Sequence, residues 1–222
     1  PVGPDSGGVP GEKAVLAQSM SVDELFEMDD PTPVPFFNGT IARGSVESIN
    51  FVNNINVPVE AEPTKWDASE AKDESIIGWY QDTDLNNLYE VYIGSDANIY
   101  APSDSTLLFG LTDSLKEINF NNFNTSNVTT MEGMFANNRS LRELNISSFD
   151  TSLVSDMEFM FRDCNSLDTI YSSDKFDTSQ VTNSREMFYN CYALDGAISY
   201  NDSKLDINYA NPDTGYFTRK NI

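Results

Sequence analysis

The sequence contains no histidine, and among its 222 residues cysteine occurs only twice, as Cys164 and Cys191. The missing histidine removes the commonest general base, the usual activator of serine and cysteine nucleophiles, and a ligand of most catalytic zinc sites. Two cysteines are too few for a disulfide scaffold. We therefore expect a chain that is not an enzyme and that carries no cofactor.

Basic residues are also scarce, since 13 Lys and Arg stand against 35 Asp and Glu, for a net charge of −22. Nucleic acids and anionic membrane surfaces both require clustered basic side chains, so neither is expected as a partner. No stretch approaches the roughly 18 apolar residues of a membrane span, and no signal-peptide pattern is present. We expect no membrane insertion of this chain.

What the sequence does contain is a repeat. The segment "NTSNVTTMEGMF" begins at Asn124, "DTSLVSDMEFMF" begins at Asp150, and "DTSQVTNSREMF" begins at Asp177. Apolar residues recur with them at intervals of 26 or 27 residues: Leu115, Leu141, Leu167 and Leu194; Met134, Met160 and Met187; Phe135, Phe161 and Phe188. Self-similarity at a fixed period indicates stacked repeats that bury a shared core.

Each repeat divides into two halves. The middle copy begins Leu141-x-x-Leu144-x-Ile146, which is the strand pattern of leucine-rich repeats. Its second half has Ser155 followed by Glu158, a capping box, and Met157, Met160 and Phe161 at helical spacing. The sequence thus predicts an α/β repeat fold, a short right-handed leucine-rich-repeat-like solenoid of strand–helix coils. Helices pack farther apart than strands, which would place the strands on a concave face.

Composition suggests four regions. Residues 1–35 are rich in Pro, Gly and Ser and predict a flexible tether, in which Ser21 and Glu24 could cap a short helix. Residues 36–103 have short apolar runs broken by turn residues, typical of a β-rich entry section and N-terminal cap. Residues 104–193 hold the 26-residue repeats. The segment "LYEVYI", which begins at Leu88, resembles the strand of a repeat one period earlier. Residues 194–222 lose the pattern but carry aromatics that would cover the core as a C-terminal cap.

The stretch "FDTSLVSDMEFMFRDCNSL" resembles the 26-residue repeat of bacterial surface proteins found in Listeria and Mycoplasma lipoproteins, a family related to BspA-like leucine-rich-repeat proteins. The flanking "WDASEAKDESIIGWY" and "NPDTGYFT" resemble the entry and exit segments of such proteins in gut Gram-positive bacteria. The resemblance covers about residues 36–219. It implies an extracellular or cell-surface location, with adhesion or host interaction as the usual proposal. The third copy departs from the pattern, with Ser184 in place of the first Met of that segment.

The outward positions of the predicted strands are the candidate binding residues. They are Lys116, Glu117 and Asn119 in the first copy, Arg142, Glu143 and Asn145 in the second, and Asp168, Thr169 and Tyr171 in the third. Solenoids commonly bind partners through such a concave surface. The alternative is an ordinary solvated sheet face. The expected partner is a protein or glycan of a host or neighbouring cell.

Two further features each allow two interpretations. The loop with Asp82, Asp84 and Asn86 begins like a calcium-binding loop, but it lacks the central glycine and the terminal glutamate. It equally fits an acidic hairpin turn, and no metal site is predicted. Cys164 and Cys191 occupy the same repeat position, so they could form a disulfide between coils or remain two small buried thiols.

We interpret the chain as a non-enzymatic surface binding or adhesion module. A structural spacer that holds another domain away from the cell is the first alternative. A carbohydrate-active enzyme is the second, because paired carboxylates can perform acid–base chemistry without histidine. Nothing in the sequence selects such a pair.

Overall fold

The computed structural model describes residues 13–18, 37 and 39–220. In this part of the chain the backbone forms strands, turns and short 3₁₀ helices, and no α-helix is present. The strands are β1 (Ala14–Val15), β2 (Val46–Val52), β3 (Trp66–Asp67), β4 (Ile77–Gln81), β5 (Tyr89–Gly94), β6 (Ile99–Tyr100), β7 (Glu117–Asn119), β8 (Phe123–Asn124), β9 (Glu143–Asn145), β10 (Thr169–Ser172) and β11 (Phe217–Arg219). The 3₁₀ helices are η1 (Arg43–Ser45), η2 (Val59–Thr64) and η3 (Ile207–Tyr209).

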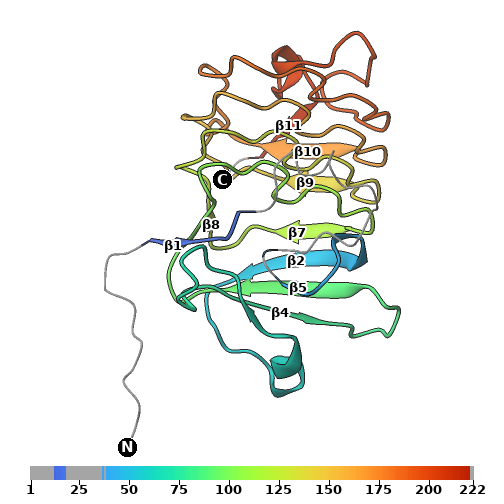
Figure 1. The fold of residues 1–222 in the computed structure, drawn as a ribbon. Coiled ribbons are helices and arrows are strands. Elements are labelled where there is room, and N and C mark those ends of the chain that lie inside the picture. Colours follow the sequence, from blue (N-terminus) through green and yellow to red (C-terminus); the bar gives the residue numbers. More distant parts are fainter. Residues whose placement is uncertain (1–12, 19–36, 38, 221–222) are drawn as a thin grey trace, which may run out of the picture.

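The strands lie one above another in the order β4, β5, β2, β7, β9, β10, β11 (Figure 1). Strand β2 pairs in parallel with β5 and β7, and β10 pairs in parallel with β9 and β11. Strand β4 is antiparallel to β5, and β3 to β4. A second, smaller parallel sheet has the order β1-β6-β8. Successive repeats therefore stack through parallel backbone pairing.

The prediction of an α/β solenoid of strand–helix coils is wrong. The fold is built from β-sheets, and the segments predicted to be helices form consecutive turns instead. The predicted cap Ser155 begins no helix: its hydroxyl donates to the Thr129 carbonyl at 3.3 Å. In the preceding repeat, the hydroxyl of Thr129 donates to the Ser103 carbonyl at 3.1 Å in the same way. The argument for a concave strand face lapses too, because it required helices on the opposite side.

Backbone hydrogen bonds explain why no helix forms. In a helix each N–H bonds the carbonyl four residues back, whereas here alternate N–H groups bond the next repeat. The N–H groups of Met131, Gly133 and Phe135 reach the carbonyls of Asp156, Glu158 and Met160 at 2.8, 2.8 and 2.9 Å. The residues between them close turns, as Met134 donates to the Met131 carbonyl at 3.1 Å and Ala136 to the Gly133 carbonyl at 2.8 Å. Stacking satisfies the backbone that a helix would satisfy internally.

These turns require left-handed backbone at two positions of every repeat. One column has φ between 51° and 58° at Leu107, Gly133, Phe159 and Glu186, and the other has φ of 61° or 62° at Leu111, Asn137, Asp163 and Asn190. Left-handed residues cannot continue a right-handed helix. Asn and Asp tolerate this conformation better than other non-glycine residues, so the second column is a sequence signal for turns.

The repeated apolar positions point inward as predicted. Leu141, Met160 and Phe161 are all fully buried, as are their counterparts in the neighbouring copies. Their aromatic members stack into a column, with ring centroids 5.6 Å apart for Phe109 and Phe135, and 5.5 Å apart for Phe161 and Phe188. The same apolar cluster extends from Ala14 to Phe217, so one continuous core joins the entry section to the repeats.

The aromatic column is closed at its C-terminal end. Tyr216 is buried and its ring meets Phe188 edge-on at 5.0 Å, while the N–H of Phe188 bonds the Leu205 carbonyl at 3.1 Å. Tyr216 thus covers this end of the core.

Arg43 joins the entry section to the first repeat turn. Its side chain is buried, and Nη1 donates to the carbonyls of Leu107, Leu108 and Gly110 at 3.0, 3.3 and 2.7 Å. Burial lowers the pKa of Arg43 to about 9. The guanidinium thus supplies hydrogen-bond donors to three buried backbone carbonyls.

The entry section differs from expectation in two respects. The strand beside β7 is β2, not β5, because Ile49 of β2 pairs with both Ile118 and Val91. Residues 13–18, inside the predicted tether, include strand β1, and Leu16 is fully buried. The rest of the tether, including the helix proposed near Ser21 and Glu24, lies outside the described residues.

Candidate binding site

A shallow hollow of about 730 Å³ lies on the outward face of β7 and β9 and reaches β10. Side chains alternate along these strands, with Glu117 and Glu143 exposed and the intervening Ile118 and Leu144 buried. The hollow is lined by Lys116, Glu117, Ile118, Asn119, Phe120, Asn121, Arg142, Glu143, Asn145, Ser147, Ser148, Tyr171 and Lys220. Its walls are therefore mainly polar side chains that the stacking of repeats brings together.

Most of the residues predicted from outward strand positions line this hollow. Lys116, Glu117, Asn119, Arg142, Glu143, Asn145 and Tyr171 are among them. Asp168 and Thr169 are not; instead the Thr169 hydroxyl donates to the Asp168 carboxylate at 2.7 Å. Repeat periodicity brought the predicted residues together because equivalent positions fall side by side on neighbouring strands.

Sequence reasoning missed the residues that come from turns and from the chain end. Asn121, Ser147 and Ser148 follow β7 and β9 directly, and Lys220 follows β11. Lys220 reaches the site because its N–H bonds the Ser172 carbonyl at 2.8 Å. The Asn-x-Asn and Asn-x-Ser patterns that begin at the last residues of β7 and β9 were the available signal for the turn residues. Nothing in the sequence placed Lys220.

Two asparagines of the hollow are held by their own turns. The Asn119 side-chain oxygen accepts the Asn121 N–H at 3.2 Å, and that of Asn145 accepts the Ser147 N–H at 3.2 Å. Such Asx turns orient the amide, because the oxygen is fixed by the backbone. The NH₂ groups, each with two donors, have no hydrogen bond to the residues that the structure describes. They are oriented donors in adjacent repeats.

The charges around the hollow are nearly balanced, in contrast to the acidic chain. Lys116 forms an ion pair with Glu47 at 2.7 Å, and the hydrogen bond from this lysine to Glu47 raises the pKa of Lys116. The Lys220 ammonium lies 5.2 Å from the centre of the Tyr171 ring. The backbone of Arg142 is fixed, since its carbonyl accepts the N–H groups of Asp168 and Thr169. Its exposed guanidinium makes no ion pair within the described residues.

In the loop with Asp82, Asp84 and Asn86, the side-chain oxygens accept hydrogen bonds from backbone N–H groups of the same loop. Asp82 accepts the N–H groups of Asn86 and Asn87 at 3.1 and 3.0 Å, and the Asn86 oxygen accepts the Leu88 N–H at 2.6 Å. The loop joins the antiparallel strands β4 and β5, as the hairpin interpretation predicted. No group of three or more metal-ligating His, Cys, Asp or Glu residues occurs in the described part of the chain.

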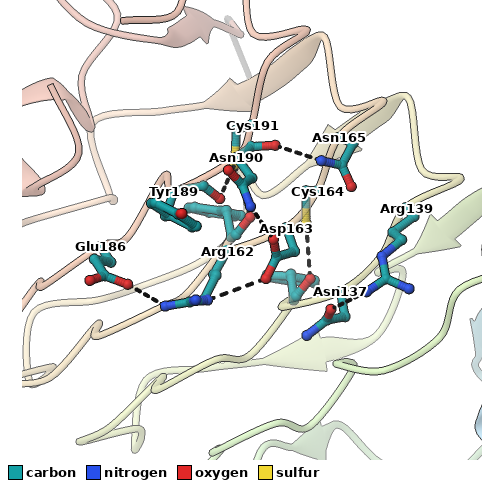
Figure 2. A network of polar contacts seen from close by, with 12 residues as sticks. Asn137, Arg139, Arg162, Asp163, Cys164, Asn165, Glu186, Tyr189, Asn190 and Cys191 are labelled. Atoms are coloured by element: carbon teal, nitrogen blue, oxygen red, sulfur yellow. Dashed lines mark hydrogen bonds and ion pairs between the residues drawn. The ribbon is translucent and has the colours of Figure 1, made fainter. Parts of the chain in front are cut away.

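The two cysteines are buried and free, and they occupy equivalent places (Figure 2). The thiol of Cys164 donates to the Phe135 carbonyl at 3.1 Å, and that of Cys191 to the Phe161 carbonyl at 2.9 Å. Asn138 fills this place in the preceding repeat and donates to the Phe109 carbonyl at 3.0 Å. Burial raises the pKa of Cys164 to about 12 and raises that of Cys191 as well. Both are structural groups with little thiolate character.

The polar cluster beside the cysteines is internally satisfied (Figure 2). Arg162 pairs with Glu186 and, at 3.2 Å, with Asp163, and its guanidinium lies 4.7 Å from the Tyr189 ring centre. Asn190 donates to the Asp163 carboxylate at 2.6 Å. This cluster ties one repeat to the next through contacts among its own side chains.

Comparison with known proteins finds a partial similarity to a family without an assigned function. Residues 105–212 match the model of a family described as "Mycoplasma protein of unknown function, DUF285". The match includes the hollow apart from Lys220. No curated protein and no solved structure matches the chain. The match supports the Mycoplasma-type part of the resemblance, whereas the leucine-rich-repeat part has no support. None of the helices among the described residues is long and apolar enough to cross a membrane.

Proposed function

We propose that this chain is a non-enzymatic binding module displayed on a bacterial surface, and that the hollow over β7 and β9 is its ligand site. The observation that carries the proposal is the set of polar side chains which stacked repeats gather there. In particular, the amides of Asn119 and Asn145 are oriented by their turns but leave their NH₂ donors without partners among the described residues. Oriented donors with unused capacity favour binding, because little conformational entropy remains to be lost.

Surface display is supported by the resemblance of the repeats to bacterial surface proteins and by the match to a Mycoplasma-type family. The strong negative charge suits a soluble domain exposed to solvent. A spacer role is the alternative, and the continuous core from Ala14 to Phe217 would suit it as well. The polar hollow is the feature that a spacer does not need.

Binding is favoured over catalysis by the environment of the carboxylates in the hollow. Glu117 and Glu143 both face this surface, and a glycosidase would require one of two such groups as a general acid. A general acid at neutral pH needs a desolvated carboxylate. Both side chains belong to exposed residues, so neither has that environment.

The test is binding of the purified chain to arrayed matrix proteins, mucins and glycans. A variant with Lys116→Glu, Arg142→Glu and Glu143→Lys should keep its circular dichroism spectrum and lose at least about tenfold in affinity for the bound ligand. The matched control reverses charges outside the hollow, at Arg139 and Asp113, which form an exposed ion pair at 3.3 Å. Unchanged binding by the first variant would move the site elsewhere, and no binding by any protein would favour the spacer.

A further inference from the structure

We propose that the ligand of this hollow is an anionic sugar, a glycan unit whose hydroxyls are recognised together with a carboxylate or sulfate. This inference rests on the proposed function and specifies the chemistry of its ligand. Three observations support it: the unused hydrogen-bond donors, a guanidinium without an ion-pair partner among the described residues, and the lack of an apolar anchor site.

The donors are the first observation. The NH₂ groups of Asn119 and Asn145 come from equivalent positions of adjacent repeats, and their orientation is set by the bonds from Asn121 and Ser147. Strands β7 and β9 are neighbours in the stack, so the two amides can bind different oxygens of one glycan unit. The carboxylates of Glu117 and Glu143 can accept hydrogen bonds from hydroxyl groups of the sugar.

The guanidinium of Arg142, in surroundings of nearly balanced charge, is the second observation. Three basic side chains, Lys116, Arg142 and Lys220, and two acidic ones line the hollow, although the whole chain carries −22. Lys116 is engaged by Glu47, whereas Arg142 has no ion-pair partner in the part of the chain that the structure describes. A guanidinium can bind a carboxylate or sulfate with two parallel hydrogen bonds. Arg142 is therefore the residue assigned to the anionic group.

The absence of an anchor site separates a sugar from an acidic peptide. Protein interfaces obtain most of their affinity from aromatic or aliphatic side chains seated in desolvated pockets. The apolar lining residues Ile118 and Phe120 expose only 8% and 9% of their surfaces. The half-buried ring of Tyr171 has the Lys220 ammonium 5.2 Å from its centre, so the lining offers no desolvated apolar pocket. A ligand that presents mainly hydroxyls and one charge matches this lining better.

The experiment measures binding of the full chain to sialyllactose, sulfolactose and lactose by calorimetry. Lactose is the neutral core of all three probes. Sulfolactose adds a sulfate to it, and sialyllactose adds a sugar that carries a carboxylate. We expect binding to at least one anionic probe, none to lactose, and weakening as salt increases. Arg142→Gln should lower the affinity about tenfold, whereas Arg139→Gln, which removes the same charge outside the hollow, should not change it.

A second pair of variants tests the amide donors. Asn145→Asp keeps the oxygen that accepts the Ser147 N–H but removes the NH₂ donors, so the turn should persist while binding falls about tenfold. Asn201→Asp changes an equivalent Asx turn outside the hollow, whose oxygen accepts the Ser203 N–H at 2.9 Å, and should leave binding unchanged.

The outcomes distinguish this inference from the proposed function. Equal binding to lactose and the anionic probes, or binding insensitive to Arg142→Gln, would overturn the anionic-sugar assignment. If all three sugars fail while an arrayed protein binds and is lost in the charge-reversed variant, the sugar assignment fails and the binding module stands. If no arrayed ligand and no sugar binds, both fail.

Discussion

The rings of Phe135 and Phe161 lie parallel, with 3° between their planes and 5.7 Å between their centroids. They occupy the same position in successive repeats, and the N–H of Phe135 bonds the Met160 carbonyl at 2.9 Å. Side-chain stacking and backbone hydrogen bonding thus join the same two repeats. The repeat period is what brings these two kinds of contact into register along the chain.

The aromatic column predicts a large effect of a single truncation. Phe161→Ala should reduce the free energy of unfolding by about 3–5 kcal/mol, because it leaves a cavity between Phe135 and Phe188. Leu153→Ala, at a side chain that is 56% exposed, should change it by less than about 0.5 kcal/mol. Urea denaturation of both variants measures the difference. Similar small effects would show that the column does not hold the repeats together.

The turns predict the sign of a glycine substitution. Gly133 has φ of 58°, and a Cβ there would meet Leu107 Cδ2 at 2.9 Å. Gly133→Ala should destabilise by at least about 1 kcal/mol. In a helix the same change would stabilise by about 1 kcal/mol, so the sign separates the two structures.

Gly44→Ala provides the control for that substitution. Its added Cβ meets nothing within 4 Å, so it should be neutral or stabilising by about 0.4–1 kcal/mol. A stabilising effect of Gly133→Ala, measured by thermal or urea unfolding, would contradict the turn structure.

How far the sequence predicts this fold depends on which contact sets the pattern. Burial of Leu141, Met160 and Phe161 was predicted correctly, because the spacing of inward positions is the same whatever backbone carries them. The helix was not, because Met131, Met134 and Phe135 have helical spacing that consecutive turns satisfy equally well. The left-handed residues Asn137, Asp163 and Asn190 decide between the two, and a propensity for turns at one position is weaker evidence than apolar periodicity.

The polar hollow over β7 and β9 was partly predictable for the same reason. Positions such as Asn119 and Asn145 follow from strand alternation and the repeat period. Lys220 does not, since it depends on how the last segment folds back beside β10. The sequence also did not predict β2 as the neighbour of β7. The pattern that begins at Leu88 resembled a repeat strand, whereas in the structure Ile49 of β2 pairs with Ile118 of β7.

The buried thiols predict low reactivity. Raising the pKa of Cys164 to about 12 by burial keeps it protonated in the folded protein at pH 8, and the same direction holds for Cys191. Only the thiolate attacks disulfide reagents. A colorimetric disulfide reagent at pH 8 should therefore find almost no thiol in the native protein and two per chain after unfolding in urea. Rapid reaction of native protein would contradict the assigned burial.

The buried arginine predicts a cost that charge alone does not explain. Arg43→Met should destabilise by about 3 kcal/mol or more, because the carbonyls of Leu107, Leu108 and Gly110 lose a donor. The free energy of unfolding of Arg43→Lys should lie between those of the unchanged protein and Arg43→Met, since an ammonium can donate hydrogen bonds but lacks the planar fork. Arg139→Met, which removes an exposed ion pair, should cost no more than about 1 kcal/mol. If urea denaturation gives equal losses of stability for Arg43→Met and Arg139→Met, the hydrogen bonds of Arg43 do not stabilise the fold as proposed.

The most direct measurement of the binding site follows the side-chain amide resonances of Asn119 and Asn145 by NMR during titration with sialyllactose and with any arrayed ligand that binds. The NH₂ signals of both residues should shift with the same saturation curve as the bound fraction. The buried amide of Asn138 should stay unchanged, because its donor is held by the Phe109 carbonyl. Saturable shifts elsewhere in the chain, with both hollow amides unmoved, would contradict the assignment of the site to the face of β7 and β9.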